Sequence, residues 1–162
     1  MTRWIAPTLA ALAYAFAVPH AAAQSAPLAP DVLARCASQV QQLREESTRL
    51  TQKSAEVDVR RNAINERSAT LKAERDALKS DDLEGGLAVR QRLQDHHAQT
   101  VAFNAEVEKL KTEIRAVNGL KRDYDGACAN RSYRRADLDA LPESARNAMR
   151  VGLGGVQVPY IE

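Results

Sequence analysis

Two cysteines, Cys36 and Cys128, are the residues whose type and spacing carry the clearest chemical meaning. Cysteines of an exported chain normally pair, because the compartments outside the cytoplasm are oxidising. We therefore expect one disulfide that joins two distant parts of the chain. Two free thiols are the alternative that the sequence leaves open.

The adjacent histidines His96 and His97 are weak candidates for a metal site. Consecutive residues of a helix point about 100° apart, so both rings cannot readily face one ion, and no third ligand lies at a helical spacing. Asp81, Asp82 and Glu84 form an acidic turn without the alternating oxygen ligands of a calcium loop. The sequence thus predicts no metal site.

No other motif predicts catalysis or a cofactor. The sequence has no glycine-rich phosphate loop, nucleophile elbow or metal-binding motif. Its 23 basic and 21 acidic residues nearly cancel, which gives no electrostatic reason to expect nucleic acid or an anionic membrane surface as a partner. We expect a protein that is not an enzyme and that contacts another protein.

Residues 1–23 are typical of a cleavable signal peptide. Arg3 precedes an apolar run over 5–18, and three alanines at 21–23 suit a signal peptidase. The apolar run is shorter than the ~20 residues that span a bilayer. We therefore expect a periplasmic or secreted protein with no membrane insertion after cleavage, and an uncleaved anchor as the alternative.

The rest of the chain divides into two long helix-forming stretches and a tail. Residues 24–30 contain prolines and predict a flexible lead, after which Asp31 suits a helix N-cap. No glycine or proline follows until the turn signals at 80–86. A second helical stretch then leads to Cys128, so that 31–128 is expected to form a hairpin.

Apolar residues recur at seven-residue intervals in both stretches, which predicts helices packed as a coiled coil. In the first stretch they are Cys36, Leu43, Leu50, Val57, Ile64, Leu71 and Leu78. In the second stretch one series is Val89, His96, Phe103, Leu110, Val117 and Tyr124, and the companion series is Leu93, Thr100, Val107, Ile114, Lys121 and Cys128; His96, Thr100 and Lys121 are the polar members.

The cysteines fix how the two stretches face each other. The midpoint of 36 and 128 is 82, inside the expected turn, so residues whose numbers sum to 164 should oppose one another. Apolar residues then meet apolar residues, as in Leu50 with Ile114, and Arg61 meets Phe103. We predict an all-α fold: a long antiparallel two-helix coiled-coil hairpin closed by a disulfide, with a short C-terminal helix and an extended tail.

The first helix also carries polar residues on its seam, namely Ser47, Ser54, Arg61, Ser68 and Arg75. Such a face is incompletely buried by one partner helix. Two hairpins that pair as a homodimer with four helices are therefore an alternative to the monomer.

Residues 129–162 are expected to form a basic loop, a helix over about 142–150 and an extended end. Either this segment packs on the open end of the hairpin and covers the disulfide, or it is a recognition element for a partner. The candidate partner contacts are Leu83, Tyr133, Arg134, Arg135, Val158, Tyr160 and Ile161.

At the level of architecture the chain resembles the small periplasmic chaperones of the Skp/OmpH type, which are also exported and built on coiled-coil arms. Those proteins have a strand-rich body, whereas no strand is expected here before the first helix, so their function is not transferred. We expect a non-enzymatic interaction or scaffold protein of the bacterial cell envelope. A holdase-type chaperone for unfolded proteins is the alternative.

Overall fold

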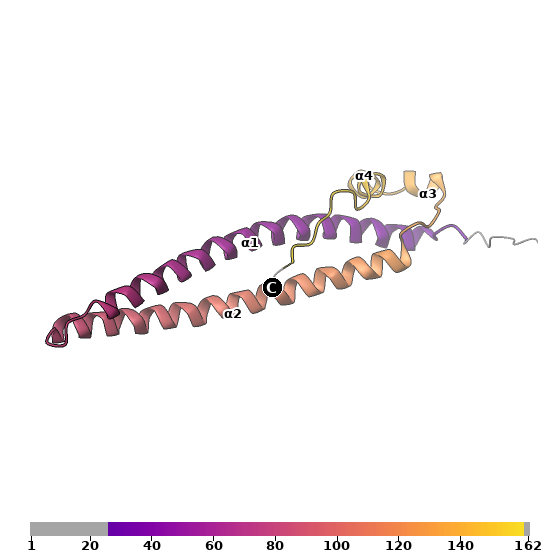
Figure 1. Cartoon of the computed structure of the whole chain (residues 1–162). Coiled ribbons are helices and arrows are strands. Elements are labelled where there is room, and N and C mark those ends of the chain that lie inside the picture. The colour runs from indigo at the N-terminus through magenta and orange to yellow at the C-terminus, as the bar shows by residue number, and fades with distance from the viewer. Residues whose placement is uncertain (1–25, 161–162) are drawn as a thin grey trace, which may run out of the picture.

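The computed structural model describes residues 26–160, and both the expected signal peptide (1–23) and Ile161 lie outside this range. Within it, the elements are α1 (Pro30–Asp76), α2 (Leu83–Ala127), α3 (Arg135–Asp139) and α4 (Glu143–Val151), with no strand. The two long helices run side by side in opposite directions, and the short helices lie at one end (Figure 1). The predicted antiparallel helical hairpin is confirmed.

The N-cap of α1 lies two residues earlier than expected. Pro30 occupies its first turn, where the missing amide hydrogen costs nothing, and Ala29 is the N-cap without a side-chain hydrogen bond. Asp31, which we expected to cap the helix, lies in the first turn and pairs with Arg35 at 3.5 Å. A carboxylate in the first turn still favours the positive end of the helix dipole.

The turn at the tip of the hairpin occupies 77–82, earlier than the 80–86 that the sequence predicted. Asp82 is the N-cap of α2, and its Oδ1 accepts a hydrogen bond of 2.8 Å from the backbone amide of Gly85. Gly85 and Gly86 therefore lie in the first helical turn. The cap outweighs the low helix propensity of the two glycines.

The core of the hairpin is a continuous apolar cluster between α1 and α2. This main cluster consists of Leu43, Leu50, Val57, Phe103, Val107, Leu110, Ile114 and Val117. Leu71 and Val89 are buried nearer the tip. All of these are positions of the seven-residue series, so the periodicity identified the buried faces of both helices.

Ion pairs along one side of the seam show the register of the two helices. They are Arg49–Glu113 at 2.8 Å, Lys53–Glu113 at 3.1 Å, Arg60–Glu106, and Glu74–Arg92 at 3.0 Å. The residue numbers of the last three pairs each sum to 166, two more than the 164 expected for facing core residues, and Arg49 reaches Glu113 from one turn before Lys53. We call this side the ion-pair flank.

The stacking of an arginine on Phe103 was assigned to the wrong residue. Arg60 lies over the ring, with 5.6 Å between its Cζ and the ring centroid, whereas Arg61 donates to Asp58 at 2.6 Å. One residue corresponds to about 100° of helix rotation. The arginine over the ring therefore lies on the flank of the seam, and Arg61 pairs within its own helix instead.

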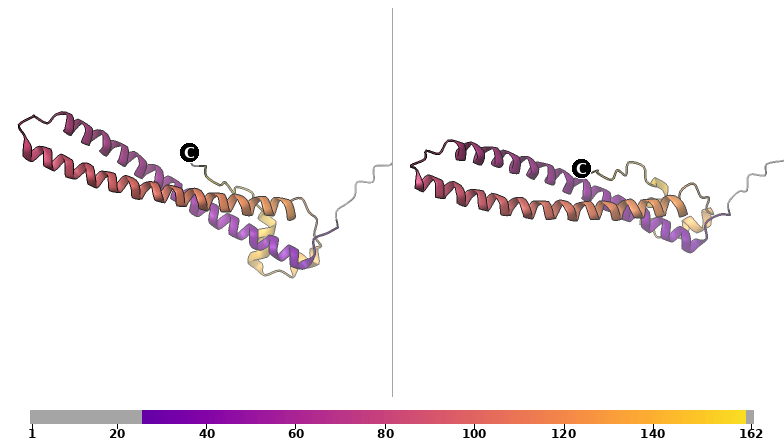
Figure 2. Two further views of the ribbon diagram at one scale, coloured as in Figure 1. Left: turned by 90° about the horizontal axis from the view of Figure 1, so that it is seen from below. Right: turned by 60° about the horizontal axis from the view of Figure 1, so that its bottom comes forward.

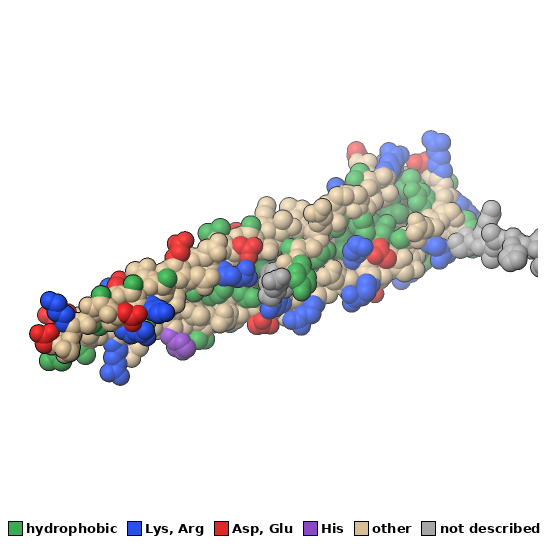
Figure 3. Space-filling view, in the orientation of Figure 1, with side chains coloured by type: hydrophobic (Ala, Val, Ile, Leu, Met, Phe, Trp, Pro, Cys, Tyr) green, Lys and Arg blue, Asp and Glu red, His purple; other side chains and the backbone are tan. Residues whose placement is uncertain are grey.

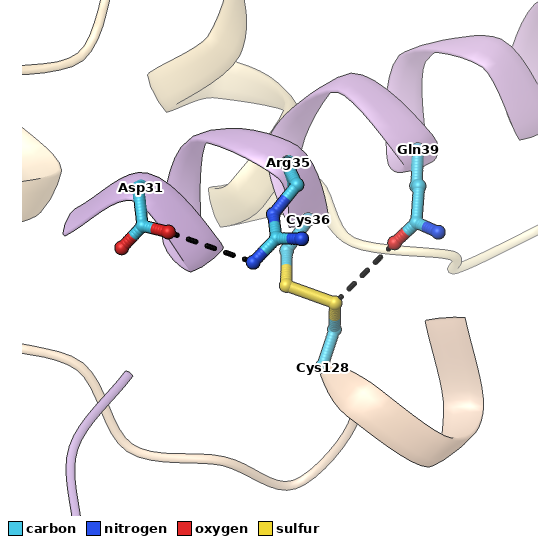
Figure 4. The surroundings of a disulfide bond; sticks show 5 residues. All are labelled: Asp31, Arg35, Cys36, Gln39 and Cys128. Carbon is cyan, nitrogen blue, oxygen red and sulfur yellow. Dashed lines mark hydrogen bonds and ion pairs between the residues drawn. A yellow bond between two sulfur atoms is a disulfide. The ribbon is translucent and has the colours of Figure 1, made fainter. Parts of the chain in front are cut away.

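The disulfide Cys36–Cys128 closes the open end of the hairpin, with 5.7 Å between the two Cα atoms (Figure 4). It lies in a second apolar cluster, the end cluster, formed by Leu28, Leu33, Cys36, Cys128 and Leu138. Leu28 is only 5% exposed, and its amide donates to the carbonyl of Ser132 at 2.8 Å. Residues 26–29 are thus held in place, although the sequence suggested a flexible lead.

The chain after Cys128 folds back on α1. Helix α3 falls within the segment that we expected to be a basic loop, and α4 lies within one residue of the expected range 142–150. Both contact α1, and Leu138, Leu141 and Met149 pack on the end cluster. The short helices therefore shield the disulfide. Residues 152–160, which we call the tail, then run back along the hairpin toward its middle (Figure 2).

Candidate interaction surfaces

The tip of the hairpin exposes two leucines. Leu83 is 80% exposed and Leu87 is 69% exposed, and their spacing of four places them on one face of the first turns of α2. The sequence singled out Leu83 but missed Leu87, although the spacing of four was a usable signal. Two leucines on one face form a small apolar contact surface, whereas the exposed Val59 and Val101 stand singly.

The acidic residues of the turn do not gather into an ion site. The Asp82 carboxylate is engaged as the cap of α2, and Asp81 and Glu84 are exposed to solvent. No group of three or more potential metal ligands occurs in residues 26–160. His96 is half-buried with an unpartnered Nδ1, and its neighbour His97 is exposed.

The tail is held mainly through its backbone. Arg44 Nη1 donates to the carbonyl oxygens of Gly152 at 3.1 Å and Gly154 at 3.3 Å, and Ser47 Oγ donates to that of Gln157 at 2.5 Å. The sequence marked Ser47 as a polar seam residue, and in the structure it is buried and its hydroxyl group binds the tail.

Apolar contacts complete the attachment of the tail. Leu153 and Val158 are half-buried against the main cluster, and Tyr160, although 84% exposed, lines a shallow hollow with residues of α2. That hollow is formed by Lys111, Ile114, Arg115 and Asn118. We call these four residues, together with Arg44 and Ser47, the tail seat.

The tail seat lies on the side of the hairpin opposite to the ion-pair flank. Arg44 and Lys53 are nine residues apart on α1, which is half a turn out of phase. In the described part of the chain, every ion pair between α1 and α2 lies on the ion-pair flank. Cross-helix ion pairs thus cover one side of the seam, and the tail covers part of the other side.

The electrostatics of the ion-pair flank centre on Glu113. Its carboxylate accepts from Arg49 at 2.8 Å and from Lys53 at 3.1 Å. The hydrogen bond from Arg49 is the main reason that the pKa of Glu113 is lowered, and hydrogen bonds to Glu46 and Glu113 raise the pKa of Arg49. Both shifts favour the charged pair. Elsewhere, Tyr124 lies between the main cluster and the end cluster, and burial raises the pKa of its hydroxyl group.

The candidate contact residues fall in three places and form no single site. Leu83 lies at the tip, Val158 and Tyr160 lie on the tail, and Tyr133, Arg134 and Arg135 lie at the open end, while Ile161 is outside the described residues. There, Tyr133 packs half-buried on the end cluster, and the exposed Arg134 and Arg135 begin α3, where Arg135 lies 3.8 Å from Asp139. Figure 3 shows apolar surface near the open end and charged side chains along the rest of the hairpin.

Helices among residues 26–160 lack the length of apolar sequence that a membrane span requires. Comparison of the chain with protein-family models, with curated proteins and with solved structures finds no match.

Proposed function

We propose that this protein is a non-enzymatic interaction or scaffold protein of the bacterial cell envelope. The observation that supports this most directly is the pair of exposed leucines at the tip, Leu83 and Leu87. Apolar side chains are costly to leave in water, and a pair on one helical face is the kind of anchor that a protein partner buries. Such a contact requires no cofactor.

The shape of the molecule supports a spacer role. Helix α2 has 45 residues, so the hairpin is roughly 70 Å long at 1.5 Å per residue. We propose that its helices supercoil as an antiparallel coiled coil, as the seven-residue pattern predicts. The tip would then meet its partner far from the disulfide-closed end, which lies where residues 1–25 join the described chain.

Two features support a location outside the cytoplasm. The leader at 1–23 has the composition of a signal peptide, and a disulfide persists in oxidising compartments such as the periplasm. We therefore propose a periplasmic or secreted protein.

Photo-crosslinking in living cells tests the interaction function. Probes replace Leu83, Leu87 and, as a mid-hairpin control, the exposed Lys109. A discrete adduct from the tip positions, absent from Lys109, is the expected result. It should disappear when the unprobed leucine of the pair is changed to serine and persist in Val59→Ser. Equal adducts from all positions would refute a tip contact.

A holdase chaperone is the second candidate, and the tail favours it. One side of the hairpin holds the tail, a segment with no helix or strand, through hydrogen bonds to its backbone carbonyls, and any unfolded segment also has such carbonyls. A holdase should suppress aggregation of an unrelated unfolded protein at near-equal concentration. A smear of crosslinked products in cells would point the same way, whereas no suppression would eliminate this candidate.

The homodimer with four helices stays a prediction. The tail now covers the Ser47 end of the polar face on which that dimer was expected to form. Sedimentation equilibrium over a wide range of concentration distinguishes a monomer from a dimer.

A further inference from the structure

We propose that the tail seat is a binding site for an extended, acidic segment of a partner protein, and that the chain's own tail occupies it as a displaceable competitor. This inference rests on the proposal that the molecule is an interaction protein. It concerns a surface distinct from the tip, so the two proposals can fail separately.

The hydrogen bonds in the seat do not select for the tail's own side chains. Arg44 and Ser47 donate to three backbone carbonyl oxygens, those of Gly152, Gly154 and Gln157. Every peptide has backbone carbonyls, and that of Gln157 lies in a part of the tail without regular secondary structure, whereas those of Gly152 and Gly154 lie in the turn at 152–155. What selects among peptides is therefore a turn that glycine favours, followed by apolar side chains at the spacing of Leu153 and Val158, which pack against the main cluster.

The charge of the seat indicates the chemistry of the partner. Three of its six residues are basic, namely Arg44, Lys111 and Arg115, and none is acidic. Lys111 is already paired with Glu108 at 3.3 Å, so Arg44 and Arg115 carry most of the positive charge that a partner would meet. The described tail, residues 152–160, carries no charged side chain to match them. An extended segment with apolar residues at the spacing of the tail and with nearby carboxylates would complement the seat better than the tail does.

The tail can detach from the tail seat without a change in the helices. Helix α4 ends at Val151, and Gly152 and Gly155 have φ angles of 59° and 77°, which glycine adopts without strain. The largest side chain of the tail, Tyr160, is 84% exposed and adds little burial. The tail competes chiefly because it is tethered, which gives it a millimolar effective concentration.

Peptide binding to the full-length chain tests this inference. The probe is a fluorescent peptide with the sequence of residues 152–162 in which Gln157 is replaced by Glu. Val158→Asp removes the apolar contact and releases the tail, whereas Gln157→Asp places the same charge on an exposed side chain. We expect the Val158→Asp chain to bind the probe at least tenfold more tightly than the wild type and Gln157→Asp, with affinity that falls as salt rises.

Further variants complete the design. Leu153→Asp removes the other apolar contact of the tail and should also increase the affinity for the probe. The circular dichroism signal of the helices confirms that each variant is folded. Adding Arg115→Glu to Val158→Asp should abolish the increase in affinity for the probe. Equal binding by wild type and both released variants would overturn the proposal. So would a wild-type dimer that Val158→Asp abolishes, because the seat would then hold the tail of a second copy.

Discussion

Glu113 is the residue at which the two long helices are most closely tied by charge. It accepts hydrogen bonds from Arg49 and Lys53 of α1, and the hydrogen bond from Arg49 is the main cause of its lowered pKa. A carboxyl group whose pKa is lower in the folded state stabilises the fold above its unfolded pKa. That contribution is lost as the pH falls through the folded value.

Replacing Glu113 with Gln should therefore lower the melting temperature by a few degrees at neutral pH, about 4 °C at most, because both partners are partly exposed. The difference between wild type and Glu113→Gln should shrink as the pH falls below about 4, where the unfolded carboxyl is protonated. Thermal melts from pH 2 to 7 at low salt measure both effects.

Glu108→Gln is the matched control, since Glu108 pairs with Lys111 of its own helix and joins no other element. Glu108→Gln should change the melting temperature less than Glu113→Gln does. A Glu113→Gln effect that stays constant from pH 7 to pH 2 would show that the charge of this carboxylate does not stabilise the hairpin.

At the scale of elements, the start of α2 is decided by a side chain rather than by helix propensity. Asp82 caps the helix by accepting from the Gly85 amide, and a Cβ atom on Gly85 would lie only 2.3 Å from Asp82 Oδ2. Apart from Gly86 itself, its chain neighbours and the adjoining helix backbone, no heavy atom lies within 4 Å of a Cβ on Gly86. The capping position of Asp82 therefore leaves no room for a side chain at 85, whereas position 86 has room for one.

Gly86→Ala should raise the free energy of unfolding by about 0.5–1 kcal/mol, because alanine loses less conformational entropy in a helix. Gly85→Ala should be less stable than Gly86→Ala by about 1 kcal/mol, since the carboxylate must leave its capping position. Urea denaturation of the two variants measures the difference. Equal stabilisation by both would mean that the Asp82 cap contributes nothing.

For the whole molecule, the disulfide is a large stabilising constraint on a thin core. It closes a loop with a sequence separation of 92, worth about 4–5 kcal/mol when loop closure in the unfolded chain is counted. That is comparable with the total stability of many small domains.

Reduction should therefore lower the thermal stability markedly and loosen the open end, where the end cluster surrounds the disulfide. Melting curves with and without reductant test this. A Cys36→Ser/Cys128→Ser variant should have the melting temperature of the reduced wild type, and reductant should not change that temperature. Coincident melts of oxidised and reduced wild type would contradict the prediction.

The hairpin was predictable because the features that indicate it are residue types and their spacing along the sequence. Residues such as Leu50 and Ile114 recur every seven positions, and Cys36 and Cys128 define the fold-back point. The same reasoning placed the turn a few residues late, because Gly85 and Gly86 look like turn residues until the Asp82 cap is seen.

The sequence by itself determined the helical hairpin, its register and the disulfide, because periodicity and spacing along the chain specify which faces must be buried together. Only the tertiary structure decided the path of residues 152–160 and hence the tail seat. That path follows the side of the seam on which the described residues form no cross-helix ion pair, and it passes the buried hydroxyl group of Ser47, which donates to it. Both properties arise from two helices together and belong to neither stretch of sequence alone.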